Sequence, residues 1–124
     1  MLDLVFVYNA DSGAIAALLD LLHKTFSPRT YPCNLCAITY STAGMRPEWR
    51  RFIKDLDLEV EFLHRDELEV RFGGRDEELP AVFRNADGRL DLLIDAVSIN
   101  TCRTLNDLEQ LVTEAISARE DQST

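Results

Sequence analysis

The chain has 124 residues, which fits one domain, and 46% of them are apolar, which is enough for a core and excludes an intrinsically disordered chain. The formal net charge of −9 argues against nucleic acid or an anionic membrane as the main partner, because both attract basic surfaces. No apolar run approaches the roughly 20 residues that span a bilayer, and the N-terminus does not resemble a signal peptide. With three cysteines in the chain, we expect a cytoplasmic protein rather than a secreted disulfide framework.

The N-terminal part of the sequence predicts two buried strands joined by a helix. Residues 4–8 (LVFVY) form a continuous apolar run of β-forming residues, which is typical of a strand buried on both faces. Asp11 or Ser12 can cap a helix that continues to about residue 26. Residues 35–40 (LCAITY) predict a second buried strand, and the helical crossover makes the two strands parallel.

The middle of the sequence continues this alternation. Pro47 fits the first turn of a second helix, whose apolar stripe includes Trp49 and Phe52. Residues 58–63 (LEVEFL) alternate between glutamate and apolar residues, which predicts a third parallel strand with one solvated face. Residues 66–72 predict a short helix that ends at a pair of glycines.

The C-terminal part predicts a hairpin and a closing helix. Residues 79–84 and 90–94 flank Asn85-Ala86-Asp87-Gly88, a strong signal for a turn between antiparallel strands. Apolar residues recur at helical spacing from about Thr104 onward. We therefore expect one domain over residues 1–118, followed by a polar tail over 119–124.

Together these elements predict an α/β fold with a central mixed β-sheet. Three parallel strands and an antiparallel hairpin form the sheet, and helices flank it on both faces. The second half of this order resembles the C-terminal half of a thioredoxin-like domain. The resemblance rests on the strand LEVEFL, the short helix, Glu78-Leu79-Pro80-Ala81, the hairpin at Asp87-Gly88 and the closing helix TLNDLEQLVTEAI. It implies that Pro80 follows a cis peptide bond and borders an active site.

The position of the cysteines departs from the thioredoxin pattern. In thioredoxins the Cys-x-x-Cys pair opens a helix, whose N-terminus stabilises the thiolate. The strand-to-helix turns predicted here, at residues 9–12 and 41–44, contain no cysteine. Cys33 and Cys36 instead precede a predicted strand, so we expect the pair at the edge of the sheet opposite Pro80, without support from a helix.

Three interpretations of Cys33-Asn34-Leu35-Cys36 remain open. In the first, Cys33 is the attacking and Cys36 the resolving thiol of a thiol–disulfide redox protein, whose partner is a protein thiol or disulfide. In the second, His23, Cys33 and Cys36 bind a soft divalent metal such as zinc, with a fourth ligand that the local sequence does not supply. In the third, both cysteines are small buried hydrophobes in a protein-binding module without catalytic activity.

Another group of residues is expected where the parallel strands end. His64, Tyr40 and Pro80 should meet at this edge, where open α/β sheets tend to bind ligands. His64 could form a general acid–base pair with Asp66 or Glu67. The alternative is a solvated, charged loop. Cys102 is expected to have a structural role, at the opposite edge from the dithiol.

Overall fold

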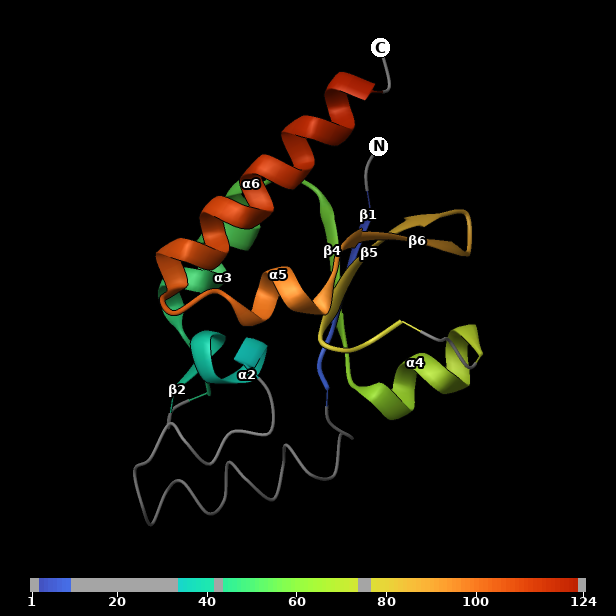
Figure 1. The fold of residues 1–124 in the computed structure, drawn as a ribbon, viewed down its shortest axis with the longest axis horizontal. Helices are drawn as coiled ribbons and strands as arrows, with labels where there is room; N and C mark the ends of the chain where they lie inside the picture. Colours follow the sequence, from blue (N-terminus) through green and yellow to red (C-terminus); the bar gives the residue numbers. More distant parts are fainter. Residues whose placement is uncertain (1–2, 10–33, 42–43, 74–76, 123–124) are drawn as a thin grey trace.

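The computed structural model of the chain describes residues 3–9, 34–41, 44–73 and 77–122 (Figure 1). The helix expected to end near residue 26, with His23 and Cys33, lies outside these residues. Within them, no helix combines the length and the apolar character that crossing a membrane requires.

A four-stranded mixed sheet forms the centre of the fold. Its strands are β1 (Asp3–Val7), β4 (Glu59–Leu63), β5 (Ala81–Ala86) and β6 (Arg89–Ile94), in the order β4-β1-β5-β6. Strand β1 pairs with β4 in parallel and with β5 antiparallel, and β5 pairs with β6 antiparallel. Strands β1, β4 and β6 therefore run in one direction and β5 in the other. The predicted mixed sheet and the hairpin are confirmed.

The apolar run of β1 supplies both faces of the sheet. Leu4, Phe6 and Tyr8 pack into one cluster, and Val5 and Val7 pack into a second cluster, because successive side chains of a strand point to opposite faces. The first cluster lies under α2 (Asn34–Thr39), α3 (Pro47–Asp55), α5 (Ala96–Asn100) and α6 (Leu105–Gln122). The second cluster lies under α4 (Arg65–Phe72), on the other side of the sheet (Figure 1).

The strand predicted over residues 35–40 is wrong. These residues belong to α2, and the chain then forms β2 (Tyr40–Ser41), which pairs with β3 (Gly44–Met45) in a separate two-stranded sheet. Leu35, Cys36, Ile38 and Thr39 are all buried. A short run that is buried on every side shows no period, so it fits a buried helix as well as a buried strand. Contacts with α5 and α6 favour the helix.

The hairpin strands and the closing helix differ from the prediction only in their bounds, whereas one further helix, α5, is new. The turn of the β5–β6 hairpin places Asp87 and Gly88 at φ 54° and 91°, and Gly88 N donates to Asn85 Oδ1 at 2.9 Å. Helix α6 continues to Gln122, into the residues expected to form a polar tail. The short helix α5 was not predicted; Asp95 caps it by accepting a hydrogen bond from Ser98 N at 2.9 Å.

Candidate functional site

Tyr8 lies where β1 ends, and it connects two of the residues expected at this edge. Its side chain is fully buried, and its backbone N–H donates to Leu63 O, the last residue of β4, at 2.9 Å. The Tyr8 ring lies 5.7 Å from the ring of Tyr40 and 5.5 Å from that of His64, measured between centroids. Tyr40 and His64 therefore meet at Tyr8. The sequence predicts Tyr8 only as part of a strand, although a polar side chain at the end of an apolar run is also a signal for a site.

Pro80 belongs to the same edge. It is buried, its peptide bond with Leu79 is cis, and it directly precedes Ala81, the first residue of β5. Ala81 pairs with Val7 in the antiparallel ladder. Continuing this register by one residue places Pro80 beside Tyr8. Figure 1 shows the end of β1, the start of α4 and the start of β5 at the same end of the sheet.

His64 is held in place by Glu67. His64 precedes α4 as its N-cap residue, and its backbone N–H donates to Glu67 Oε1 at 2.9 Å. The ring atom Nδ1 lies 2.5 Å from the same oxygen. The hydrogen bond from the His64 backbone, followed by that from its ring, lowers the pKa of Glu67 below its ordinary value. A carboxylate at Nδ1 favours the tautomer with the proton on Nδ1, which leaves Nε2 as a hydrogen-bond acceptor. Of the two carboxylates named in the prediction, Glu67 is the one for which this contact with the ring is observed.

Two polar atoms of this cluster are buried without a hydrogen-bond partner. In the part of the chain that the structure describes, three buried side-chain atoms have no partner, namely Tyr8 Oη, His64 Nε2 and Trp49 Nε1. Most buried polar groups in proteins are hydrogen-bonded, so each exception needs an explanation. Two of these three atoms belong to rings in contact. Tyr8 Oη and His64 Nε2 are therefore two such atoms on neighbouring rings, whose centroids lie 5.5 Å apart.

The surroundings of Tyr8 keep its phenol protonated. Burial raises the pKa of Tyr8 far above its ordinary value, and the neighbouring Tyr40 and Cys36 raise it further. The hydroxyls of Tyr40 and Thr39 are polar neighbours of Tyr8, but neither reaches it with the geometry of a normal hydrogen bond. Thr39 Oγ1 instead donates to Leu35 O at 2.7 Å. Tyr8 therefore remains a neutral hydroxyl group.

The structure changes the expected position of Cys36. Cys36 is the third residue of α2 and is fully buried, in the same apolar cluster as Tyr8. Figure 1 shows α2 at the end of the sheet where β1 ends. The expectation that the dithiol precedes a strand and lies at the opposite edge from Pro80 is therefore wrong for Cys36. Cys33, which directly precedes α2 in the sequence, and His23 lie outside the described residues.

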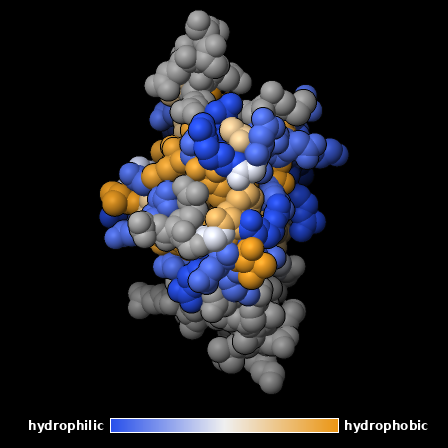
Figure 2. Space-filling model, turned by 90° about the vertical axis from the view of Figure 1, so that its right-hand side faces the viewer, coloured by the Kyte–Doolittle hydropathy of each residue, from blue (hydrophilic) through white to orange (hydrophobic). Residues whose placement is uncertain are grey.

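A shallow cavity of about 310 Å³ adjoins this cluster. Asn9, Arg65 and Leu79 are among the residues that line it. Each is next in the sequence to a residue of the cluster: Asn9 follows Tyr8, Arg65 follows His64, and Leu79 precedes Pro80. Its remaining walls come from α4 and the segment that follows it, namely Leu68, Glu69, Gly73 and Glu77. The surface on this side of the molecule mixes apolar and hydrophilic side chains (Figure 2). Residue Val70 in α4 is 86% exposed, which is the largest exposed fraction of any large apolar residue in the described part of the chain.

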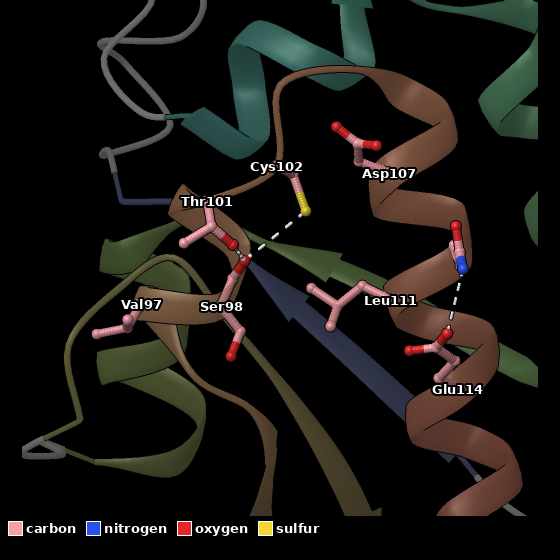
Figure 3. Close-up of a pocket in the computed structure, with 8 residues that line it drawn as sticks. Val97, Ser98, Thr101, Cys102, Asp107, Leu111 and Glu114 are labelled. Carbon is pink, nitrogen blue, oxygen red and sulfur yellow. Dashed lines mark hydrogen bonds between the residues drawn. The ribbon is translucent and has the colours of Figure 1, made fainter.

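A second cavity, of about 520 Å³, lies between α5 and α6 (Figure 3). Cys102 lines it and donates from Sγ to Ser98 O at 3.7 Å. Burial, and then the charge of Asp107, raise the pKa of the Cys102 thiol. A thiol that stays protonated is a poor nucleophile, which favours a packing role.

Cys36 and Cys102 belong to the same apolar cluster, and α2 contacts α5. The expectation that Cys102 lies at the opposite edge from Cys36 is therefore wrong. Because β6 runs in the direction of β1, the segment after β6 reaches the edge of the sheet where Tyr8 lies.

The predicted zinc ligands are only partly described. Among residues 3–9, 34–41, 44–73 and 77–122, no group of three His, Cys, Asp or Glu side chains has an arrangement suited to a metal ion. Of the expected ligands, only Cys36 belongs to these residues. No protein-family model, curated protein or solved structure matches the chain.

Proposed function

We propose that the protein is a thioredoxin-like thiol–disulfide oxidoreductase of the cytoplasm, with Cys33 as the attacking thiol and Cys36 as the resolving thiol. Its substrate class is a protein disulfide. The order of the elements supports the thioredoxin-like fold. From β4 onward the chain forms a strand, a short helix, a proline that opens the next strand, a hairpin and a closing helix, which is the order on which the resemblance rests.

The position of Cys36 carries this proposal. Its side chain is fully buried in the first turn of α2, at the edge of the sheet where Tyr8 and Pro80 lie. A resolving thiol has to react only with the sulfur of its partner cysteine, so burial protects it from other oxidants without preventing its reaction. Two residues separate Cys33 from Cys36 in the sequence, which is the spacing of the thioredoxin Cys-x-x-Cys pair.

The reaction is a two-step exchange. The Cys33 thiolate attacks one sulfur of the partner disulfide, forms a mixed disulfide and releases the first partner thiolate. Cys36 then loses its proton and attacks the Cys33 sulfur, which forms the Cys33–Cys36 disulfide and releases the second partner thiolate. The partner disulfide gains two electrons, and the dithiol loses two.

Cysteine variants test the proposal with a small protein disulfide such as that of insulin as substrate. The Cys36→Ser variant should accumulate a mixed disulfide that mass spectrometry detects, because the second step is blocked. The Cys33→Ser variant should be inactive, and Cys102→Ala serves as the matched control that retains the activity of the full chain. Reduction at the normal rate by Cys33→Ser would contradict the proposal.

A zinc site formed by His23, Cys33 and Cys36 is the second candidate. The buried sulfur of Cys36 also suits a structural zinc ligand, since such sites are closed to solvent. Elemental analysis of protein purified without chelator distinguishes the two functions. The redox proposal predicts no bound zinc, and about one zinc per chain, lost in Cys36→Ser, would support the metal site instead.

A further inference from the structure

We propose that the groove between α5 and α6 is a docking site for a partner protein, and that it binds a segment in which apolar side chains stand beside lysine or arginine. The groove is the cavity of about 520 Å³ that Cys102 lines (Figure 3). Its volume lies in the range of pockets that hold ligands. The inference does not depend on thiol–disulfide chemistry, so it can be tested separately from the proposed function.

Helix α6 forms one wall of the groove. Asp107, Leu111 and Glu114 line it and are spaced by four and three residues, so they form one row along the helix. Leu108 and Val112 belong to another face of α6 and are fully buried in the core. A partner in the groove therefore contacts the side chains of the row without disturbing the packing of α6 on the sheet.

Apolar surface lies in the middle of the groove and at its rim. Leu111 extends from α6 toward α5 and is only partly buried (Figure 3). Val97 of α5 is 68% exposed, although valine is among the residue types most often buried in folded proteins. An apolar side chain of the partner that enters the groove removes part of both surfaces from water, which stabilises the complex.

The two charged side chains among the residues that line the groove are carboxylates. Asp107 Oδ2 accepts hydrogen bonds from the backbone N–H groups of Arg103 and Thr104 at 3.1 and 3.2 Å, which fixes its position at the start of α6. Glu114 Oε1 accepts a hydrogen bond from Gln110 Nε2 at 3.2 Å (Figure 3). These hydrogen bonds use one oxygen of each carboxylate, so the other can accept from a lysine or arginine of the partner.

The negative charge extends into the groove. Backbone hydrogen bonds, and then the charge of Arg103, lower the pKa of Asp107, so its carboxylate is ionised at neutral pH. Burial, and then the charge of Asp107, raise the pKa of the Cys102 thiol, which lines the groove. The net charge of −9 also attracts a basic partner from a distance. Charge complementarity therefore favours a basic segment over an acidic one.

Binding of labelled peptides, measured by fluorescence anisotropy, tests the proposal. Two peptides combine leucine with arginine, one at helical spacing and one in strict alternation, and two control peptides carry glutamate in place of arginine. We expect at least one arginine peptide to bind the full chain, less tightly as salt is raised, because salt screens charges at the surface. If neither arginine peptide binds more tightly than its glutamate control, the proposal is overturned.

A charge reversal at the rim locates the binding site. Val97→Lys should weaken binding of the arginine peptide about tenfold, because like charges at an interface repel. The matched control is Val70→Lys, which makes the same change at an exposed valine of α4, on the other side of the sheet. This control should stay within about twofold of the full chain, since a distant exposed charge is largely screened.

Neutral variants of the carboxylates test the charge complementarity. Asp107→Asn and Glu114→Gln should each weaken binding about threefold, as expected for an ion pair at a surface. Asp107→Asn keeps an oxygen that can accept the backbone hydrogen bonds at the start of α6. Glu109→Gln is the matched control, because it removes one charge from the same helix at a position that does not line the groove.

The outcomes separate binding in the groove from attraction by the net charge. If Val70→Lys and Glu109→Gln weaken binding as much as the groove variants do, the peptide responds only to the overall charge, and the proposal is overturned. It is also overturned if Val97→Lys, Asp107→Asn and Glu114→Gln all bind as tightly as the full chain. Weaker binding in the groove variants alone supports the docking site.

Discussion

The rings of Tyr8 and His64 lie 5.5 Å apart, measured between centroids, at the ends of two adjacent parallel strands, and each ring carries a buried polar atom without a hydrogen-bond partner in the described part of the chain. A buried hydroxyl or imidazole nitrogen without a partner has lost its hydrogen bonds with water, and no hydrogen bond within the protein replaces them. Within the described residues nothing offsets this cost, so the arrangement lowers the stability of the fold.

The substitution Tyr8→Phe should stabilise the protein. It removes the unpartnered hydroxyl and leaves the ring in place, so the free energy of unfolding should rise by about 1 kcal/mol, the low end of the penalty for a buried unsatisfied group. Denaturant unfolding measures this change. Tyr40→Phe is the comparison variant, because Tyr40 is only partly buried. A loss of 1 kcal/mol or more in Tyr8→Phe would mean that the hydroxyl has a partner in the folded state.

The contribution of Glu67 to stability should depend on pH. Its pKa in the folded state is lowered, chiefly by the hydrogen bond from the His64 backbone, so its carboxylate is stabilised by folding. The contribution is present above the pKa of the unfolded chain and is lost as pH falls through the lower pKa of the folded state. Glu67→Gln should therefore be less stable than the full chain at neutral pH, and the difference should shrink in acid.

Unfolding curves of both proteins at neutral pH and at acidic pH measure that difference. The control is Glu69→Gln, on the exposed side of the same helix, for which we expect the same small difference at both pH values. A Glu67→Gln difference that stays constant or grows in acid would contradict the stabilising contact between Glu67 and His64.

Cys102 should react slowly with alkylating reagents. Burial and the charge of Asp107 raise its pKa, so the folded protein should show a midpoint of alkylation above the ordinary thiol value of about 8.5. Mass spectrometry of peptides after timed alkylation across pH measures this midpoint for each cysteine. In denaturant the Cys102 midpoint should return to the ordinary value. Rapid modification of Cys102 in the folded protein at neutral pH would be inconsistent with its place in the cavity between α5 and α6.

The sequence predicts the fold correctly where its residue pattern is compatible with only one kind of element. Residues 4–8 are too short for a helix and rich in β-forming residues, and Asp87-Gly88 specifies a turn with two positive φ angles. Residues 35–40 have no such pattern. A helix buried on all sides and a strand buried on both faces need the same apolar residues, and only contacts with α5 and α6, distant in the sequence, favour the helix.

The sequence predicts the edge at which the candidate site lies, but the prediction did not include Tyr8, its central residue. The rule that ligands bind where parallel strands end identifies His64, Tyr40 and Pro80 from the predicted order of elements. Tyr8 belongs to this group because β1 ends beside it, and the polar end of the apolar run 4–8 was a signal for it. The larger error was the strand predicted over residues 35–40. The same error moved Cys36 to the wrong edge, since a strand and a helix place the start of the segment at opposite ends of the sheet.

The disulfide state of the three cysteines tests the central claim most directly. The full chain is equilibrated in a glutathione buffer of increasing oxidising strength, alkylated and mapped by mass spectrometry after proteolysis. We predict that a single intramolecular disulfide, Cys33–Cys36, forms reversibly while Cys102 remains a thiol. A chain in which Cys36 pairs with Cys102, or in which Cys33 and Cys36 both remain thiols under the most oxidising conditions, would contradict the account.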